Sequence, residues 1–186
     1  MDFNEHFRFK GLHSMLSASK YHWINYDKEK FIKVYDNYEA KLKGTADHEF
    51  AALCISRGQK LPKTKQTLNM YVNDAIGFHL KPEVVLKYSD NCFATADAID
   101  FKERQKLLRI HDLKTGLTPA HMEQLMVYAA YFCLEYKKKP SEFQTELRIY
   151  QANDIQVYKP TPEEIVPIMD KIIFFNRIIE ERKHEL

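Results

Sequence analysis

The chain has 186 residues, and its 28 Lys and Arg against 26 Asp and Glu leave a formal net charge of only +2. This length predicts one domain with a hydrophobic core of its own. Hydrophobic residues make up 45% and charged residues 29%, which excludes a disordered chain and a strongly basic nucleic-acid coat protein. No apolar run approaches the roughly 18 residues that a membrane span requires.

The cysteines and the start of the chain indicate a reducing compartment. Cys54, Cys92 and Cys133 are odd in number, lie far apart and form no Cys-x-x-Cys pair. This pattern is typical of buried, reduced thiols rather than of disulfides or a cysteine-bound zinc or iron–sulfur site. The first residues also lack the basic flank and apolar stretch of a signal peptide. We therefore expect a cytoplasmic protein.

The hydrophobic pattern predicts an α/β (α+β) fold with a single domain at 1–186. Its parts are a helical segment at 1–81, a sheet core at 82–160 and a C-terminal helix at 161–186. No Gly/Pro-rich linker separates them. The expected architecture is a central mixed sheet flanked by helices.

The helical segment contains three predicted helices. Apolar residues recur with helical spacing over 28–43. Thr45 can cap a second helix, which Gly58 would end, and residues 64–80 predict a third.

After Pro82 the period changes to that of strands, which are predicted at 83–88, 92–101, 107–114, 143–150 and 155–158. A helix is expected at 118–136, with Thr118 as its N-cap. The sequence Pro160-Thr-Pro-Glu-Glu would open the last helix, with a bend at Pro167.

The strands at 92–101 and 107–114 place two acids together. If residues 103–106 form the loop of a hairpin, Asp97 lies directly opposite Asp112. Lys114 follows Asp112 on the same face, because side chains alternate along a strand. The other residues on this face are apolar, namely Ile99, Phe101, Leu108 and Ile110.

Facing carboxylates on a core face require a compensating cation, because like charges repel more strongly in a low dielectric. Alternating Asp and Lys usually mark a solvated face, but the apolar companions here favour a buried one. Carboxylates suit Mg²⁺ or Mn²⁺, which can polarise a phosphate and activate a water for attack. Lys114 would stabilise the developing negative charge. The pattern therefore indicates phosphodiester hydrolysis.

These residues resemble the signature of the PD-(D/E)XK nuclease superfamily, in its RecB-like branch. Asp97 and Asp112-Leu-Lys114 stand at its acidic and lysine positions. Gly44-Thr-Ala-Asp-His48 is similar to its upstream Gly-Thr-x-x-His motif, and Gln124-Leu-Met-Val-Tyr128 to its downstream Gln-x-x-x-Tyr motif. The likeness covers roughly residues 11–160, and motifs in this order are more specific than a lone Asp-x-Lys.

The resemblance implies a restriction-endonuclease-like core and a compact, phage-type relative of the CRISPR-associated RecB-like exonucleases, without their iron–sulfur cluster. It implies that His48, Asp97, Asp112 and the carbonyl of Leu113 would bind Mg²⁺ or Mn²⁺. His48 would lie in the first turn of its helix, where the dipole keeps the imidazole neutral. Glu83 is a weaker candidate for a further acidic group.

The same resemblance assigns the remaining site residues. Lys114 would be the catalytic lysine. Gln124 and Tyr128, four apart and therefore on one helical face, would orient Lys114 and contact the DNA backbone. Basic residues around the loop after the second helix would follow the phosphates or simply be solvated, namely Arg57, Lys60, Lys63 and Lys65.

We therefore expect a metal-dependent deoxyribonuclease, foremost an exonuclease that acts on single- or double-stranded DNA ends in phage or bacterial recombination, replication or repair. A phage recombination or replication protein would be its partner, a homo-oligomer would suit processive action, and the host cytoplasm would be its location. The alternatives are a structure-specific endonuclease and a catalytically silent DNA- or protein-binding module on the same fold.

Overall fold

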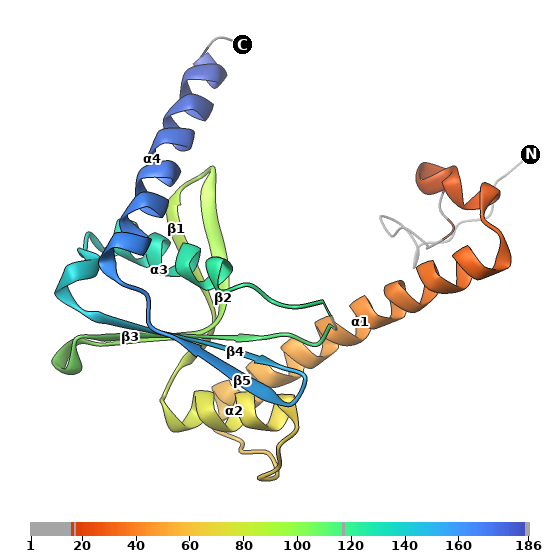
Figure 1. The fold of residues 1–186 in the computed structure, drawn as a ribbon, viewed down its shortest axis with the longest axis horizontal. Helices are drawn as coiled ribbons and strands as arrows, with labels where there is room; N and C mark the ends of the chain where they lie inside the picture. The colour runs from red at the N-terminus through yellow and green to blue at the C-terminus, as the bar shows by residue number, and fades with distance from the viewer. Residues whose placement is uncertain (1–15, 17, 117, 185–186) are drawn as a thin grey trace, which may run out of the picture. The chain divides into compact units, whose positions relative to one another are not determined.

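A computed structural model of the chain (Figure 1) describes residues 16, 18–116 and 118–184. The chain forms two compact units, Met1–Lys43 and Gly44–Leu186. The boundary falls inside the helical segment expected at 1–81. The second unit contains the sheet and every candidate site residue.

The first unit contains the short helix η2 (Ala18–Asn25) and the start of helix α1 (Lys28–Arg57). Asp27 caps α1, because the backbone N–H of Lys30 donates to its Oδ1 at 2.8 Å. The predicted division of this region into two helices is wrong, since α1 continues through Gly44. Gly44 is buried in the helix interior, where it allows close packing instead of ending the helix.

The second unit is built on a five-stranded mixed sheet whose spatial order follows the sequence: β1 (Lys81–Ser89), β2 (Cys92–Lys102), β3 (Leu107–Leu113), β4 (Gln144–Gln151) and β5 (Asp154–Tyr158). Neighbouring strands are antiparallel, except that β3 and β4 are parallel. All five predicted strands are present. The expected α/β fold with a central mixed sheet is confirmed.

The register between β2 and β3 is also the predicted one. Ile99 pairs with Ile110, and the hairpin closes with Lys102 opposite Leu107. The short helix η3 (Glu103–Gln105) occupies the loop. The apolar face shared by these two strands is therefore the one expected from their alternation.

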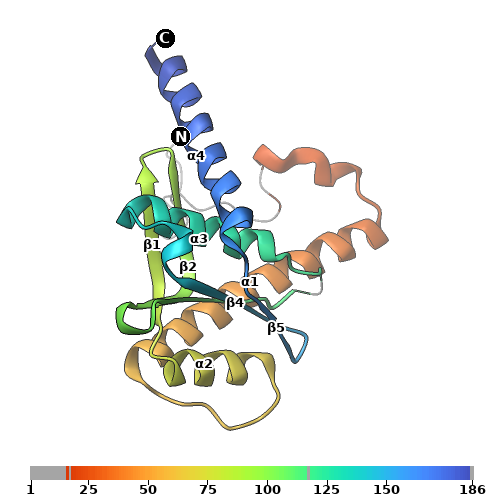
Figure 2. The same cartoon turned by 60° about the vertical axis from the view of Figure 1, so that its left-hand side comes forward.

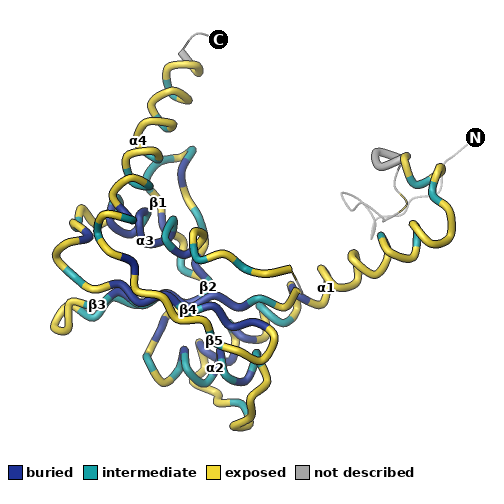
Figure 3. Tube along the Cα trace, in the orientation of Figure 1, coloured by how far each residue is buried: buried dark blue, intermediate teal, exposed yellow. Residues whose placement is uncertain are grey.

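Helices cover both faces of the sheet (Figures 1 and 2). Helices α3 (Met122–Tyr136) and α4 (Pro162–His184) pack on the face that carries Leu108 and Ile110. Helix α2 (Thr67–Gly77) and the end of α1 pack on the face that carries Leu113. Strands β3 and β4 lie buried between these layers, as Figure 3 shows.

Helix α3 begins at Met122 instead of the predicted Thr118. The side chain of Gln151 explains this difference, because it binds the backbone of the preceding segment. Its Nε2 donates to the carbonyls of Gly116 and Thr118 at 2.7 and 2.8 Å, and its Oε1 accepts from the N–H of Ala120 at 3.1 Å. These backbone groups are thus satisfied without a helical turn.

The bounds of two other helices differ from the predicted ones by less. Helix α2 is shorter than the predicted 64–80, and α4 begins at Pro162 and continues through Pro167. The three cysteines are free and buried, as expected. Among the described residues, no helix combines the length and apolar character needed to cross a membrane.

Candidate active site

His48 reaches the sheet because α1 packs closely on the segment after β3. A Cβ added to Gly44 would lie 2.7 Å from Oγ1 of Thr115, the residue that follows Lys114. Residues four apart share one face of a helix, so the contact at Gly44 also directs His48 toward the sheet. The expectation that His48 lies in a first helical turn is wrong, since it is in the interior of α1. The helix dipole therefore gives no reason for a neutral imidazole.

His48, Glu83 and Asp97 form a cluster suited to a metal ion. One ligand atom from each lies within 4.8 Å of the others. Nδ1 of His48 is 3.4 Å from Oδ2 of Asp97. The structure thus brings together two of the predicted ligands, and it adds the acid that the sequence ranked as the weaker candidate.

Glu83 enters this cluster with an unusual backbone conformation. Its φ is +51°, in the left-handed region that residues with a side chain seldom adopt. Its neighbours Pro82 and Val84 both pair with β2, so Glu83 stands opposite Asp97. Partial burial and the Asp97 carboxylate raise the pKa of Glu83. Two facing carboxylates in a strained segment indicate a position held for a charge-dependent role.

Asp112 lies beside this cluster at the end of β3. The β2–β3 ladder ends at Ala98 and His111, so Asp97 and Asp112 are the next facing positions. The backbone N–H of Leu113 donates to Oδ2 of Asp97 at 3.0 Å, which fixes one acid relative to the other strand. Burial, followed by repulsion from Asp97, raises the pKa of Asp112 to about 6.

A chain of hydrogen bonds connects Asp112 to helix α3. Lys114 donates from Nζ to Oδ1 of Asp112 at 3.2 Å and to Oε1 of Gln124 at 2.9 Å. Nε2 of Gln124 in turn donates to the hydroxyl of Tyr128 at 2.9 Å. Tyr128 is buried. These hydrogen bonds join Lys114, Gln124 and Tyr128 in one chain, while the expected roles of Gln124 and Tyr128 in orienting Lys114 and contacting DNA stay a prediction.

The residues present fit a divalent cation. Oδ2 of Asp112 is buried and accepts no hydrogen bond from any residue that the structure describes, although Nζ of Lys114 lies 2.9 Å away. Lys114 alone does not offset the burial of this carboxylate, because burial and the charge of Asp97 still raise the pKa of Asp112 to about 6, so a second cation would be favoured here. Carboxylates suit Mg²⁺ and Mn²⁺, and imidazole is a ligand for later transition metals as well. The ligand role of the Leu113 carbonyl stays a prediction.

The basic residues of the α1–α2 loop lie at the surface. Arg57, Lys60, Lys63 and Lys65 are exposed. The end of this loop is tied to the β4–β5 turn, because the N–H of Thr67 donates to Oδ1 of Asn153 at 3.1 Å and the N–H of Asn153 donates to Oγ1 of Thr67 at 2.7 Å. The loop is thus anchored next to the end of β4.

Comparisons with protein-family models, with curated proteins and with solved structures found no match. The geometry of the site, together with the motifs in the sequence, is therefore the basis for its interpretation.

Proposed function

We propose that this chain is a metal-dependent deoxyribonuclease that hydrolyses phosphodiester bonds at the cluster around Asp97 and Asp112. The observation that carries the proposal is the combination of two elements in one place. His48, Glu83 and Asp97 bring three ligand atoms within 4.8 Å of one another beside the buried carboxylate of Asp112. Lys114 is held next to that carboxylate by Gln124. Phosphodiester hydrolysis needs both a bound cation and a positioned positive charge.

The ligands follow from the same geometry. Mg²⁺ or Mn²⁺ held by His48, Asp97 and Asp112, with Glu83 and the Leu113 carbonyl as further ligands, would polarise the phosphate and lower the pKa of a bound water. When Asp112 is ionised, binding of the cation is favoured because it offsets the repulsion between the carboxylates of Asp97 and Asp112.

Lys114 contributes the second positive charge. Its ammonium faces the site from the end of β3, where it stabilises negative charge that develops on the phosphoryl oxygens. Gln124 holds Lys114, and Tyr128 holds Gln124, so little reorganisation is needed during the reaction. Water adds to phosphorus, the bond to O3′ breaks, and the products carry a 5′-phosphate and a 3′-hydroxyl.

The substrate we propose is DNA, foremost the ends of linear DNA in phage or bacterial recombination, replication or repair. The exposed basic residues of the α1–α2 loop support an interaction with phosphates. A silent binding module is the less favoured alternative, because both acids and the lysine are present and the lysine is oriented. A structure-specific endonuclease would use the same site and differ only in substrate geometry.

The test is digestion of end-labelled linear single- and double-stranded DNA beside closed circular DNA, with Mn²⁺, Mg²⁺ or EDTA. Asp112→Ala should abolish cleavage, whereas Glu49→Ala, an exposed acid next to His48 on α1, should not. Loss of linear DNA with circles intact supports the exonuclease. Nicked circles support the endonuclease. A folded protein that cleaves nothing, or an Asp112→Ala variant that cleaves normally, would overturn the proposal.

A further inference from the structure

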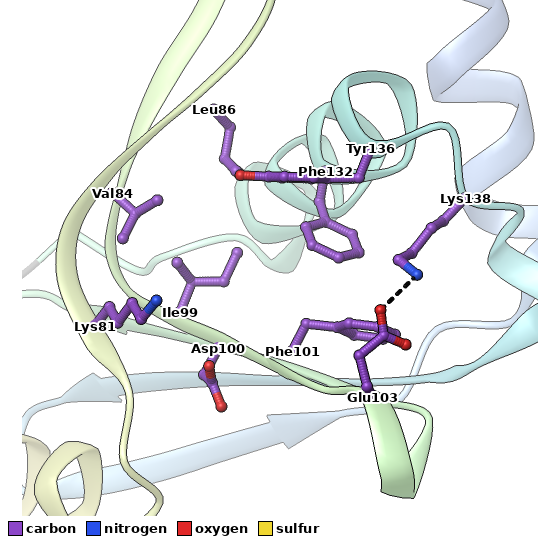
Figure 4. A pocket seen from close by; sticks show the side chains of 10 residues that line it. All are labelled: Lys81, Val84, Leu86, Ile99, Asp100, Phe101, Glu103, Phe132, Tyr136 and Lys138. Atoms are coloured by element: carbon purple, nitrogen blue, oxygen red, sulfur yellow. Dashed lines mark hydrogen bonds and ion pairs between the residues drawn. The ribbon is translucent and has the colours of Figure 1, made fainter.

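A cavity of about 310 Å³ lies between β1, β2 and the second half of α3 (Figure 4). Val84 and Ile99 form one wall, and the rings of Phe101, Phe132 and Tyr136 form the other. Phe132 is central to this aromatic wall, because its ring centroid is 5.1 Å from that of Phe101 and 5.0 Å from that of Tyr136. The cavity therefore offers an aromatic lining, in which the Phe132 ring is tilted by 47° to that of Phe101 and by 39° to that of Tyr136.

This cavity begins one helical turn from the candidate active site. Gln124, Tyr128, Phe132 and Tyr136 recur at intervals of four on α3 and so form one row along the helix. The first two of them orient Lys114, and the last two line the cavity. Phe132 is only about 6 Å along the helix axis from Tyr128. A ligand that spans both places must therefore bridge at least about 6 Å.

Strand β2 shows the same proximity. Ile99 follows Asp97 by two residues, which is about 7 Å along a strand. On β1, Lys81 and Val84 both line the cavity. Glu83, which forms the candidate metal cluster with His48 and Asp97, lies between them in the sequence. Strands β1 and β2 and helix α3 thus each supply residues to both the cavity and the candidate active site.

The cavity also carries charged side chains of both signs, namely Lys81 and Lys138 with Asp100 and Glu103. Nζ of Lys138 lies 4.7 Å from the centroid of the Phe101 ring and pairs with Glu103 at 3.0 Å. In Figure 4 the ammonium of Lys81 points toward Val84 and Ile99. Tyr136 is 52% exposed, so part of its ring is open to an incoming ligand.

We propose that this cavity binds an unpaired base of the DNA strand, next to the phosphodiester that is cleaved. This inference rests on the proposed nuclease function and specifies its substrate. A base stacks on aromatic side chains through its π-face, which every base has, so binding should depend little on sequence. A paired base is stacked within its duplex and must leave it to enter the cavity. The preferred substrate is therefore a single strand or a frayed end.

The experiment measures binding and cleavage separately. Fluorescent single-stranded oligonucleotides carry one abasic residue that is moved stepwise along the strand. Their affinity is measured by anisotropy with Mn²⁺ in an Asp112→Asn background, which prevents turnover. At one position relative to the bound phosphodiester, loss of the base should weaken binding about 5- to 150-fold. Cleavage is measured with the otherwise native protein.

Two variants identify the cavity as the cause. Tyr136→Ala should weaken binding of the intact strand. It should also remove most of the difference in affinity between intact and abasic strands, because losing the ring and losing the base are not additive when the two groups touch. Phe175→Ala removes a similarly exposed aromatic ring, 55% exposed on α4, and should leave both affinities unchanged. In the cleaving protein, Tyr136→Ala should raise KM by a similar factor with little change in kcat.

The results separate the two proposals. Strands bound with no position sensitive to base loss, or a Tyr136→Ala variant that behaves like Phe175→Ala, would overturn the cavity assignment even if the native protein cleaves DNA. Absence of binding to any strand would overturn it as well. Base-dependent binding that Tyr136→Ala abolishes would support the cavity, and absence of cleavage by the native protein would then contradict the nuclease alone.

Discussion

Lys114 places its ammonium nitrogen 2.9 Å from Oδ2 of Asp112, whose side chain is 1% exposed. This ion pair does not compensate for burial, because the pKa of Asp112 still rises to about 6. Burial and the charge of Asp97 both favour the protonated acid, and together they outweigh Lys114. At neutral pH the site therefore holds negative charge at a cost in stability, which a bound cation would relieve.

The pH dependence of stability should reveal this cost. Between the ordinary pKa of 3.8 and the folded value of about 6, the folded state binds more protons at Asp112 than the unfolded state. The free energy of unfolding therefore falls as pH rises through this window and stays lower above it. In EDTA, Asp112→Asn should be more stable than the native protein at pH 8 by on the order of 2 kcal/mol. The two should converge near pH 4.

Urea denaturation in EDTA at several pH values measures this difference. Subtracting the native curve from the Asp112→Asn curve removes the contributions of acids that do not interact with Asp112. Curves that stay parallel from pH 4 to 8 would show that Asp112 titrates normally.

Glu83 should contribute to metal affinity. Its carboxylate lies within 4.8 Å of ligand atoms on His48 and Asp97, so Glu83→Gln removes one negative charge from the ion's surroundings and should weaken Mn²⁺ binding about tenfold. Excess Mn²⁺ at about 100 times its Kd should stabilise the native fold by about 2.7 kcal/mol. Thermal melts across a Mn²⁺ titration measure both effects. Glu49→Gln is the matched control, and a Glu83→Gln variant with the same titration midpoint would exclude Glu83 as a ligand.

The part of the site that lies on the β2–β3 hairpin could be predicted from the sequence. Alternation of apolar residues and a short loop determine the register, and the register alone places Asp97 opposite Asp112. The position of Glu83 could not be found in this way. The β1–β2 register shifts between Lys87 and Ser89, so counting back from the turn puts Glu83 one position out of register.

The interior of α1 shows a second limit of sequence patterns. Glycine near a capping threonine usually marks a helix boundary, yet Gly44 is in mid-helix because α1 packs against Thr115. Helix α3 starts late because Gln151, distant in sequence, binds the preceding backbone. Both outcomes depend on tertiary contacts, which local propensity does not contain.

Lys114 should act in turnover and not in metal binding. Lys114→Ala removes positive charge at the reacting phosphate and should lower kcat by about 10² to 10³-fold while Mn²⁺ still binds. Tyr128→Phe removes only the hydroxyl that accepts from Gln124, and a smaller loss of about tenfold in kcat is expected. Tyr131→Phe, on the same helix, is the control. Single-turnover cleavage and Mn²⁺ melts separate the two roles, and loss of Mn²⁺ binding in Lys114→Ala would contradict this assignment.

Gly44 and Thr115 should be strongly coupled in stability. Glycine inside a helix costs about 1 kcal/mol relative to alanine, but a Cβ at Gly44 would lie 2.7 Å from Oγ1 of Thr115 and 3.9 Å from its Cβ. In Gly44→Ala alone, the clash with Thr115 should cancel the gain in helix stability. It should also displace His48 and so weaken Mn²⁺ binding. In a Thr115→Ala background only the ordinary 3.9 Å contact remains, so the same change should stabilise the protein by about 1 kcal/mol.

Gly77→Ala, where no atom lies within 4 Å, should have the same effect in both backgrounds. A double-mutant cycle by urea denaturation measures the coupling, and additive Gly44 and Thr115 effects would mean that α1 does not depend on this contact to position His48.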